Sequence, residues 1–144
     1  MSRLQRVMCV DDEDDILEVV RLCLEMIGGL EVFCCHSGHE ALQQIALIRP
    51  DLILLDVMMP GMDGPATFLE LQKSELNTVP VIFMTARVRN TESDEYMRLG
   101  ASGVVAKPFD PATLPADIER IWRTIQQKQE QQPHFWASAA PARD

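Results

Sequence analysis

The stretch Leu52-Ile53-Leu54-Leu55-Asp56 consists of four aliphatic residues followed by one acid. A short run that is apolar at every position is typical of a strand covered on both faces, as in a parallel sheet between helices. Four further runs of similar length read as strands: Arg6–Val10, Glu31–Cys35, Val81–Met84 and Gly103–Ala106. We therefore expect five strands.

Segments with a helical period lie between and after these runs. In the first segment, Ile16, Val20, Cys23 and Ile27 share one helical face. We expect Gly28-Gly29 to end this helix, because glycine readily adopts the left-handed conformation found there. The other expected helices are Gly38–Ile48, one from about Asp63-Gly64-Pro65 to about Leu76, a short one after a polar loop at Arg87–Thr91 that ends near Leu99-Gly100, and a last one beginning near Pro115 after a turn at Asp110–Thr113.

Five strands that alternate with five helices predict an α/β domain with a parallel sheet covered on both faces. Ligands of such sheets bind beyond the carboxyl ends of the strands. Three carboxylates, one hydroxyl and one ammonium are predicted at these ends, and together they suit a Mg²⁺-dependent phosphoryl acceptor. They belong to Asp11, Asp12, Asp56, Thr85 and Lys107.

Each of these side chains also has a plainer interpretation. Asp11-Asp12 could cap a helix, and taken alone Thr85 and Lys107 would be an ordinary strand end and a surface charge. A buried Asp56, in contrast, would be costly without charged neighbours. The Lys107-Pro108 bond could be cis, aiming the lysine into the site, or trans at the end of an edge strand.

Composition narrows the functional classes. The 144 residues are 47 % hydrophobic, which is enough for one domain with a core. The formal net charge of −9 argues against nucleic-acid binding by this chain alone. The four cysteines lack a CxxC spacing, so we expect buried thiols. We find no signal peptide or membrane-length apolar segment, and therefore expect a cytoplasmic protein without membrane insertion.

Several motifs, taken together, resemble a two-component response regulator receiver domain of the chemotaxis-regulator type, either stand-alone or excised from a longer protein. They are Val10-Asp11-Asp12-Glu13, the segment from Asp56 to Gly64, Met84-Thr85-Ala86 and Lys107-Pro108-Phe109. The resemblance covers roughly Arg6 to Gln126. It implies a flavodoxin-like three-layer sandwich with strand order 2-1-3-4-5. We expect residues 1–128 to form this domain and the Gln-, Ala- and Pro-rich residues 129–144 to be a disordered tail.

The resemblance also implies roles. Asp56 would accept a phosphoryl group from a histidine kinase, a phosphotransfer protein or a small phosphodonor, and the phosphorylated domain would change its binding to an output protein. Asp12, Asp56 and the Met58 carbonyl would bind Mg²⁺ directly, with Asp11 acting through water. Thr85, Lys107 and the Ala86 backbone N–H would contact the phosphoryl group.

One position departs from the family pattern, and two other functions remain open. Val104 replaces an aromatic residue common in the fifth strand of the family, so we expect the readout of the switch to need another element. The first alternative is a degenerate, phosphorylation-independent binding module, which would normally lack one of the five site residues. The second is a Mg²⁺-dependent aspartyl phosphotransferase, which would need a second acid just past the nucleophile, where Met58 stands. We expect a self-phosphorylating acceptor, with autodephosphorylation, and not a turnover enzyme.

Overall fold

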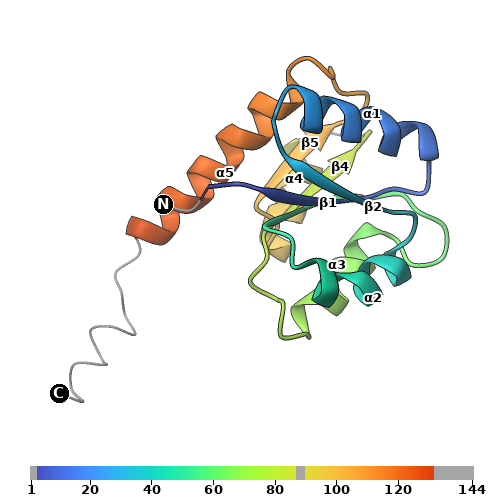
Figure 1. Cartoon of the computed structure of the whole chain (residues 1–144). Coiled ribbons are helices and arrows are strands. Elements are labelled where there is room, and N and C mark those ends of the chain that lie inside the picture. Colours follow the sequence, from blue (N-terminus) through green and yellow to red (C-terminus); the bar gives the residue numbers. More distant parts are fainter. Residues whose placement is uncertain (1–2, 87–89, 132–144) are drawn as a thin grey trace.

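The computed structural model describes residues 3–86 and 90–131, which form a parallel sheet between two layers of helices (Figure 1). The strand order is β2-β1-β3-β4-β5, and every neighbouring pair is parallel. This is the flavodoxin-like order, so the predicted fold is confirmed. The strands are β1 (Arg6–Val10), β2 (Glu31–Cys35), β3 (Leu52–Asp56), β4 (Val81–Thr85) and β5 (Gly103–Ala106).

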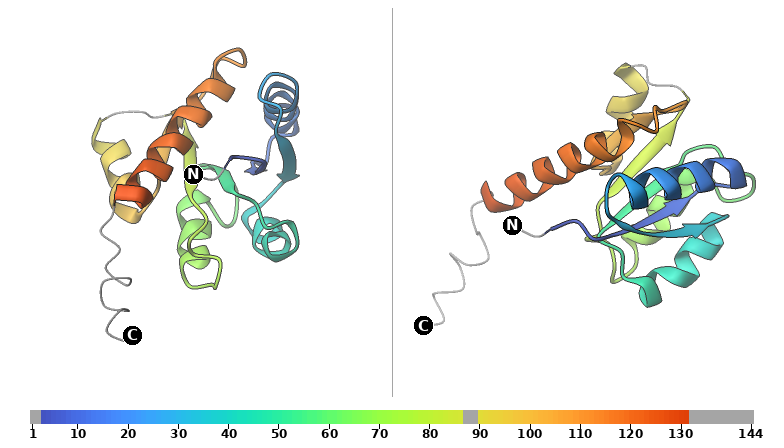
Figure 2. Two further views of the ribbon diagram at one scale, coloured as in Figure 1. Left: turned by 60° about the vertical axis from the view of Figure 1, so that its left-hand side comes forward. Right: turned by 45° about the horizontal axis from the view of Figure 1, so that its top comes forward.

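Helices follow each strand and cover both faces of the sheet. One hydrophobic core joins α1 and α5 to one face, and a second core joins α2 and α3 to the other, where Tyr96 of α4 also packs. The two views in Figure 2 show the sheet between these layers. The helices are α1 (Asp14–Met26), α2 (Gly38–Ile48), α3 (Gly64–Gln72), α4 (Asn90–Leu99) and α5 (Leu114–Gln131).

The apolar run of β3 supplies both cores at once. Successive side chains of a strand point to opposite faces of the sheet. Accordingly Leu52 and Leu54 pack in the core under α1 and α5, whereas Ile53 and Leu55 pack in the core under α2 and α3. All five residues of β3 are buried, as predicted for a strand covered on both faces.

The predicted buried face of α1 is only partly right. Val20 and Cys23 are buried as expected, but Leu17 and Leu24 complete the buried face. Ile27 was expected in the core and is 61 % exposed. The regular helix ends at Met26, so Ile27 lies at the helix terminus.

Helix α3 is shorter than the sequence suggested. It ends at Gln72 and not near Leu76. The Ser74 hydroxyl donates a hydrogen bond to the Leu71 carbonyl at 2.7 Å and accepts one from the Leu76 N–H at 3.1 Å. A serine side chain that bonds to nearby backbone in this way competes with continuation of the helix.

The starts of the last two helices test two further predictions. Helix α4 begins at Asn90, so Thr91 is helical and not part of a loop, whereas residues 87–89 lie outside the described part of the chain. Helix α5 begins at Leu114, after a turn in which the Thr113 and Leu114 N–H groups donate to the Asp110 carbonyl. This confirms the predicted start near Pro115.

The C-terminal end of α5 lies slightly beyond the boundary expected at residue 128, because the helix continues to Gln131. The rest of the predicted tail lies outside the described residues. Among the helices of the described part, none combines the length and apolar character needed to cross a membrane.

Gly64 begins α3 directly against the end of β3. A Cβ added at residue 64 would collide with the Asp56 carbonyl oxygen and would lie 2.9 Å from the Val57 Cα. Both neighbours are backbone atoms, which cannot rotate away. We therefore expect Gly64→Ala to lower the free energy of unfolding by about 2–3 kcal/mol, measured by urea unfolding.

Gly29→Ala is the matched control. The Gly29 backbone has φ +66°, and an added Cβ would meet no atom within 4 Å. Only the strain of a left-handed backbone remains, so the expected loss is about 1 kcal/mol. Equal losses in the two variants would contradict a role for the close approach to β3.

Candidate functional site

The candidate site lies at the carboxyl edge of the sheet, at the ends of the neighbouring strands β1, β3, β4 and β5. Asp11 directly follows β1, and Lys107 directly follows β5. Asp56 and Thr85 are the last residues of β3 and β4. The strands that carry these four residues are neighbours in the sheet, so the predicted convergence of their ends is present in the structure.

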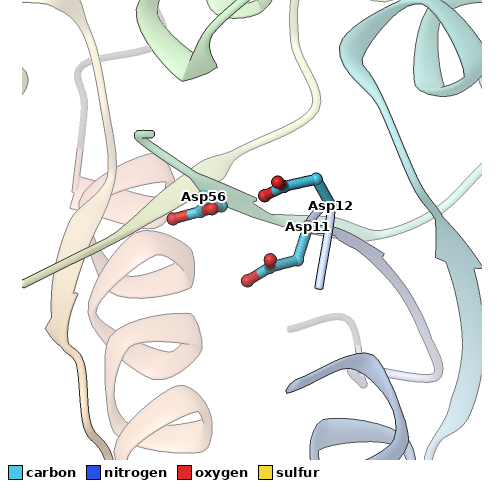
Figure 3. A group of neighbouring side chains, drawn as sticks. All are labelled: Asp11, Asp12 and Asp56. Atoms are coloured by element: carbon cyan, nitrogen blue, oxygen red, sulfur yellow. The ribbon is translucent and has the colours of Figure 1, made fainter. Parts of the chain in front are cut away.

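Three carboxylates meet at the ends of β1 and β3 (Figure 3). One oxygen from each of Asp11, Asp12 and Asp56 lies within 4.8 Å of the other two. Asp11 is fully buried and Asp56 is 3 % exposed, whereas Asp12 faces solvent. The group therefore combines two sheltered carboxylates with one that reaches water.

Backbone contacts fix the position of Asp11. Its N–H donates to the Cys35 carbonyl at 3.1 Å, which ties the end of β1 to the end of β2. Its Oδ1 accepts a hydrogen bond from the Glu13 N–H at 2.9 Å. The second oxygen, Oδ2, remains directed at the site, where it contacts Lys107.

The Lys107 ammonium lies among these acids. Its Nζ is 2.9 Å from Asp11 Oδ2 and 3.2 Å from Asp56 Oδ1, and it donates a hydrogen bond to each. The Lys107 backbone N–H donates to the Thr85 carbonyl at 2.8 Å, which joins the ends of β4 and β5. The Lys107-Pro108 peptide bond is cis, the first of the two conformations weighed from the sequence.

The surroundings of Asp56 disfavour the ionised form of its carboxyl. The pKa of the Asp56 carboxyl is raised to about 6: burial is the largest cause and the Asp11 charge adds to it, whereas Lys107 and the Met58 N–H act in the opposite direction. Burial alone would lower the pKa of Lys107, but its hydrogen bonds and charge contacts with Asp11 and Asp56 raise it above the ordinary value. One ammonium thus offsets two buried carboxylates only in part.

The other predicted residues lie at or just after the ends of β3 and β4. Thr85 is buried at the end of β4, and Ala86 follows it at the surface. Met58 is 74 % exposed in the segment after β3. The Val57 N–H donates to the Met84 carbonyl at 3.0 Å, which connects that segment to β4.

Sequence reasoning gave no role to one residue of the site. The Glu13 side chain approaches Lys107, with Oε1 at 3.8 Å from Nζ. Glu13 directly follows the Asp11-Asp12 pair, so its place in the chain was the available signal. Its identity alone did not reveal the contact, because an acid before a helix is also a common helix-start residue.

The donor set fits Mg²⁺. This cation prefers oxygen ligands and usually keeps several waters, so one or two carboxylates beside solvent are enough. Asp11, Asp12 and Asp56 supply such oxygens within the required span. These are also the three acids that we expected, from the sequence, to bind the cation.

Comparison with known proteins identifies the family of this chain. Residues 7–119 match the family model described as "Response regulator receiver domain". The chain is 30 % identical to a solved chemotaxis response regulator of Vibrio cholerae, with a TM-score of 0.75, over 83 % of this chain and 99 % of that one. A solved Francisella response regulator receiver domain is 26 % identical, with a TM-score of 0.75, over 84 % and 98 % of the two chains.

Longer regulators contain a similar segment. The regulatory protein AtoC of Escherichia coli is 35 % identical over 90 % of this chain and 28 % of its own length. The transcriptional regulatory protein CseB of Streptomyces coelicolor is 37 % identical over 85 % of this chain and 51 % of its own length. The chain therefore spans about half or less of these two curated relatives.

The family match covers most of the chain, and the fold is that of the chemotaxis regulators. The members of this family are signalling switches and not turnover enzymes. The chain belongs to the receiver domains of two-component response regulators.

Proposed function

We propose that Asp56 is the phosphoacceptor of this receiver domain and that its phosphorylation requires Mg²⁺. The observation that carries the proposal is the placement of the Asp56 carboxylate, which is buried beside Asp11 and contacts Lys107. A nucleophile for phosphoryl transfer needs this combination of a fixed oxygen and nearby positive charge.

In the proposed reaction, an Asp56 carboxylate oxygen attacks the phosphorus of a phosphohistidine. The new P–O bond forms as the P–N bond breaks, and the electron pair stays with the imidazole nitrogen, which then takes up a proton. A small donor such as acetyl phosphate would lose acetate by cleavage of its P–O bond. Hydrolysis of the aspartyl phosphate by water would restore Asp56 and release phosphate.

Asp12, Asp56 and the Met58 carbonyl would hold the cation directly, and Asp11 would hold it through water. When bound, the cation offsets the repulsion between the attacking carboxylate and the incoming phosphoryl oxygens. Three adjacent carboxylates beside one ammonium would favour a divalent ion, because Lys107 offsets only part of their charge. Solvent exposure of Asp12 leaves room for the waters that Mg²⁺ retains.

Thr85, Lys107 and the Ala86 N–H would contact the phosphoryl oxygens after transfer. The hydroxyl and the ammonium are suitable hydrogen-bond donors for such oxygens. Because Thr85 and Lys107 are joined through their backbones, both donors would respond to one added group. This response would shift the domain between two conformations and change its binding to an output protein.

The partners follow from the family. We propose that a histidine kinase or a histidine phosphotransfer protein supplies the phosphoryl group. The similarity to transcriptional regulators makes an output segment in a longer protein one route for the signal. A separate output protein is the other.

The phosphoacceptor chemistry can be tested by intact-mass spectrometry. We expect one phosphoryl adduct after incubation with acetyl phosphate and Mg²⁺. No adduct should form in EDTA, because the carboxylates would then repel the donor, and none should form in Asp56→Asn. An adduct on Asp56→Asn, or none on folded wild-type protein, would contradict the proposal.

The raised pKa of Asp56 has a consequence for stability without metal. The folded carboxyl has a pKa of about 6 against an ordinary 3.8, so ionisation of Asp56 opposes folding at neutral pH. We expect Asp56→Asn to raise the free energy of unfolding by roughly 2 kcal/mol near neutral pH in EDTA. The gain should shrink as pH falls through about 6, because the wild-type carboxyl is then protonated in the folded state.

Urea unfolding across this pH range measures the difference, and Asp51→Asn is the control. Asp51 Oδ2 accepts hydrogen bonds from the N–H groups of Gln5 and Arg6, at 3.0 and 2.8 Å. Removing this charge should therefore lower stability. A gain for Asp56→Asn that does not change with pH would refute the assignment to carboxyl ionisation.

A further inference from the structure

Glu13 has a side chain that its own helix does not use. It is the N-cap residue of α1, but its side chain makes no capping hydrogen bond. At this position the side-chain oxygen commonly accepts a hydrogen bond from one of the first free N–H groups of the helix. The Glu13 carboxylate instead approaches Lys107 at 3.8 Å and is 64 % exposed.

Lys107 therefore has three acidic neighbours of different character. Asp11 and Asp56 are buried and hold the ammonium by short hydrogen bonds. The Glu13 side chain is longer than that of an aspartate and is exposed to solvent. At 3.8 Å its carboxylate is too far from the Lys107 ammonium for a hydrogen bond. A modest change in the side-chain torsions of Glu13 and Lys107 would shorten this contact without a change in the backbone.

The ammonium contacts two of the carboxylates that a divalent cation would use. A cation held by Asp56 and approached by Asp11 would repel Lys107, and the two cannot share these oxygens at full strength. The displaced ammonium then needs a counter-ion within reach of its side chain. Glu13 is the remaining acid that contacts Lys107 among the described residues.

We propose that Glu13 is a positioning residue that receives the Lys107 ammonium when a divalent cation takes the oxygens of Asp11 and Asp56. The inference rests on the cation site proposed above. Glu13 lowers the cost of moving Lys107 and thereby raises cation affinity, without itself being a ligand. It also keeps Lys107 at the rim of the site, from which the ammonium can reach a phosphoryl group on Asp56.

A double-mutant cycle separates this role from a general effect of charge. The metal-free protein is titrated with magnesium chloride, and the dissociation constant is measured from amide NMR shifts. The variants are Glu13→Gln, Lys107→Met and their combination. Asp15→Asn is the matched control, because Asp15 is an exposed acid of the first turn of α1 that has no contact with Lys107.

We expect Glu13→Gln to weaken Mg²⁺ binding about threefold to fivefold, as for a partly exposed ion pair. In the Lys107→Met background the same change should alter the dissociation constant by less than about twofold, because no ammonium remains to be received. Asp15→Asn should have an effect below about twofold in both backgrounds.

Two results would overturn the inference. An equal loss in both backgrounds would show that Glu13 acts on the cation directly, and a loss no larger than that of Asp15→Asn would show a general charge effect. Circular dichroism checks the fold of each variant, and Lys107→Gln provides a second background if Lys107→Met unfolds. Wild-type protein that fails to bind Mg²⁺ would instead contradict the proposed cation site itself.

Discussion

The interaction on which the site depends is the sharing of one ammonium by two buried carboxylates. Parallel strands bring the residues after β1 and β5 and the last residue of β3 to one edge of the sheet, and there Lys107 contacts both Asp11 and Asp56. One positive charge cannot balance two negative charges in a sheltered place, and the pKa of Asp56 is raised first by its burial and then by the Asp11 charge. The fold thus maintains a site that favours additional positive charge.

Backbone hydrogen bonds, and not the side-chain charges, hold the ends of the strands together at this edge. The Asp11 N–H reaches the Cys35 carbonyl, and the Lys107 N–H reaches the Thr85 carbonyl. These bonds continue the pairing of β1 with β2 and of β4 with β5 past the last residue of β1 and β5. Because the backbone sets the positions, the acids are held near one another despite their repulsion.

Much of the fold could be predicted because a strand that is apolar at every position must be buried on both faces of its sheet. A run such as Leu52–Asp56 must be covered on both faces, and alternation with helices then restricts the architecture. The errors arose where a local competitor decided the outcome. Ser74 bonds to the backbone near Leu71 and Leu76 and ends α3 early, while the 3.6-residue period placed Ile27 on the buried face of α1 although its side chain is 61 % exposed.

The residues of the site could be predicted from the sequence, but the contacts between their side chains could not. Placement at strand ends identified Asp11, Asp56 and Lys107, because topology alone brings them together. Which oxygen each charge contacts depends on side-chain torsions, and these are absent from a pattern of residue types. Glu13 shows the consequence. From its residue type, Glu13 is an ordinary acid at a helix start. Only the position of its side chain, which makes no capping hydrogen bond and approaches Lys107, makes it part of the site.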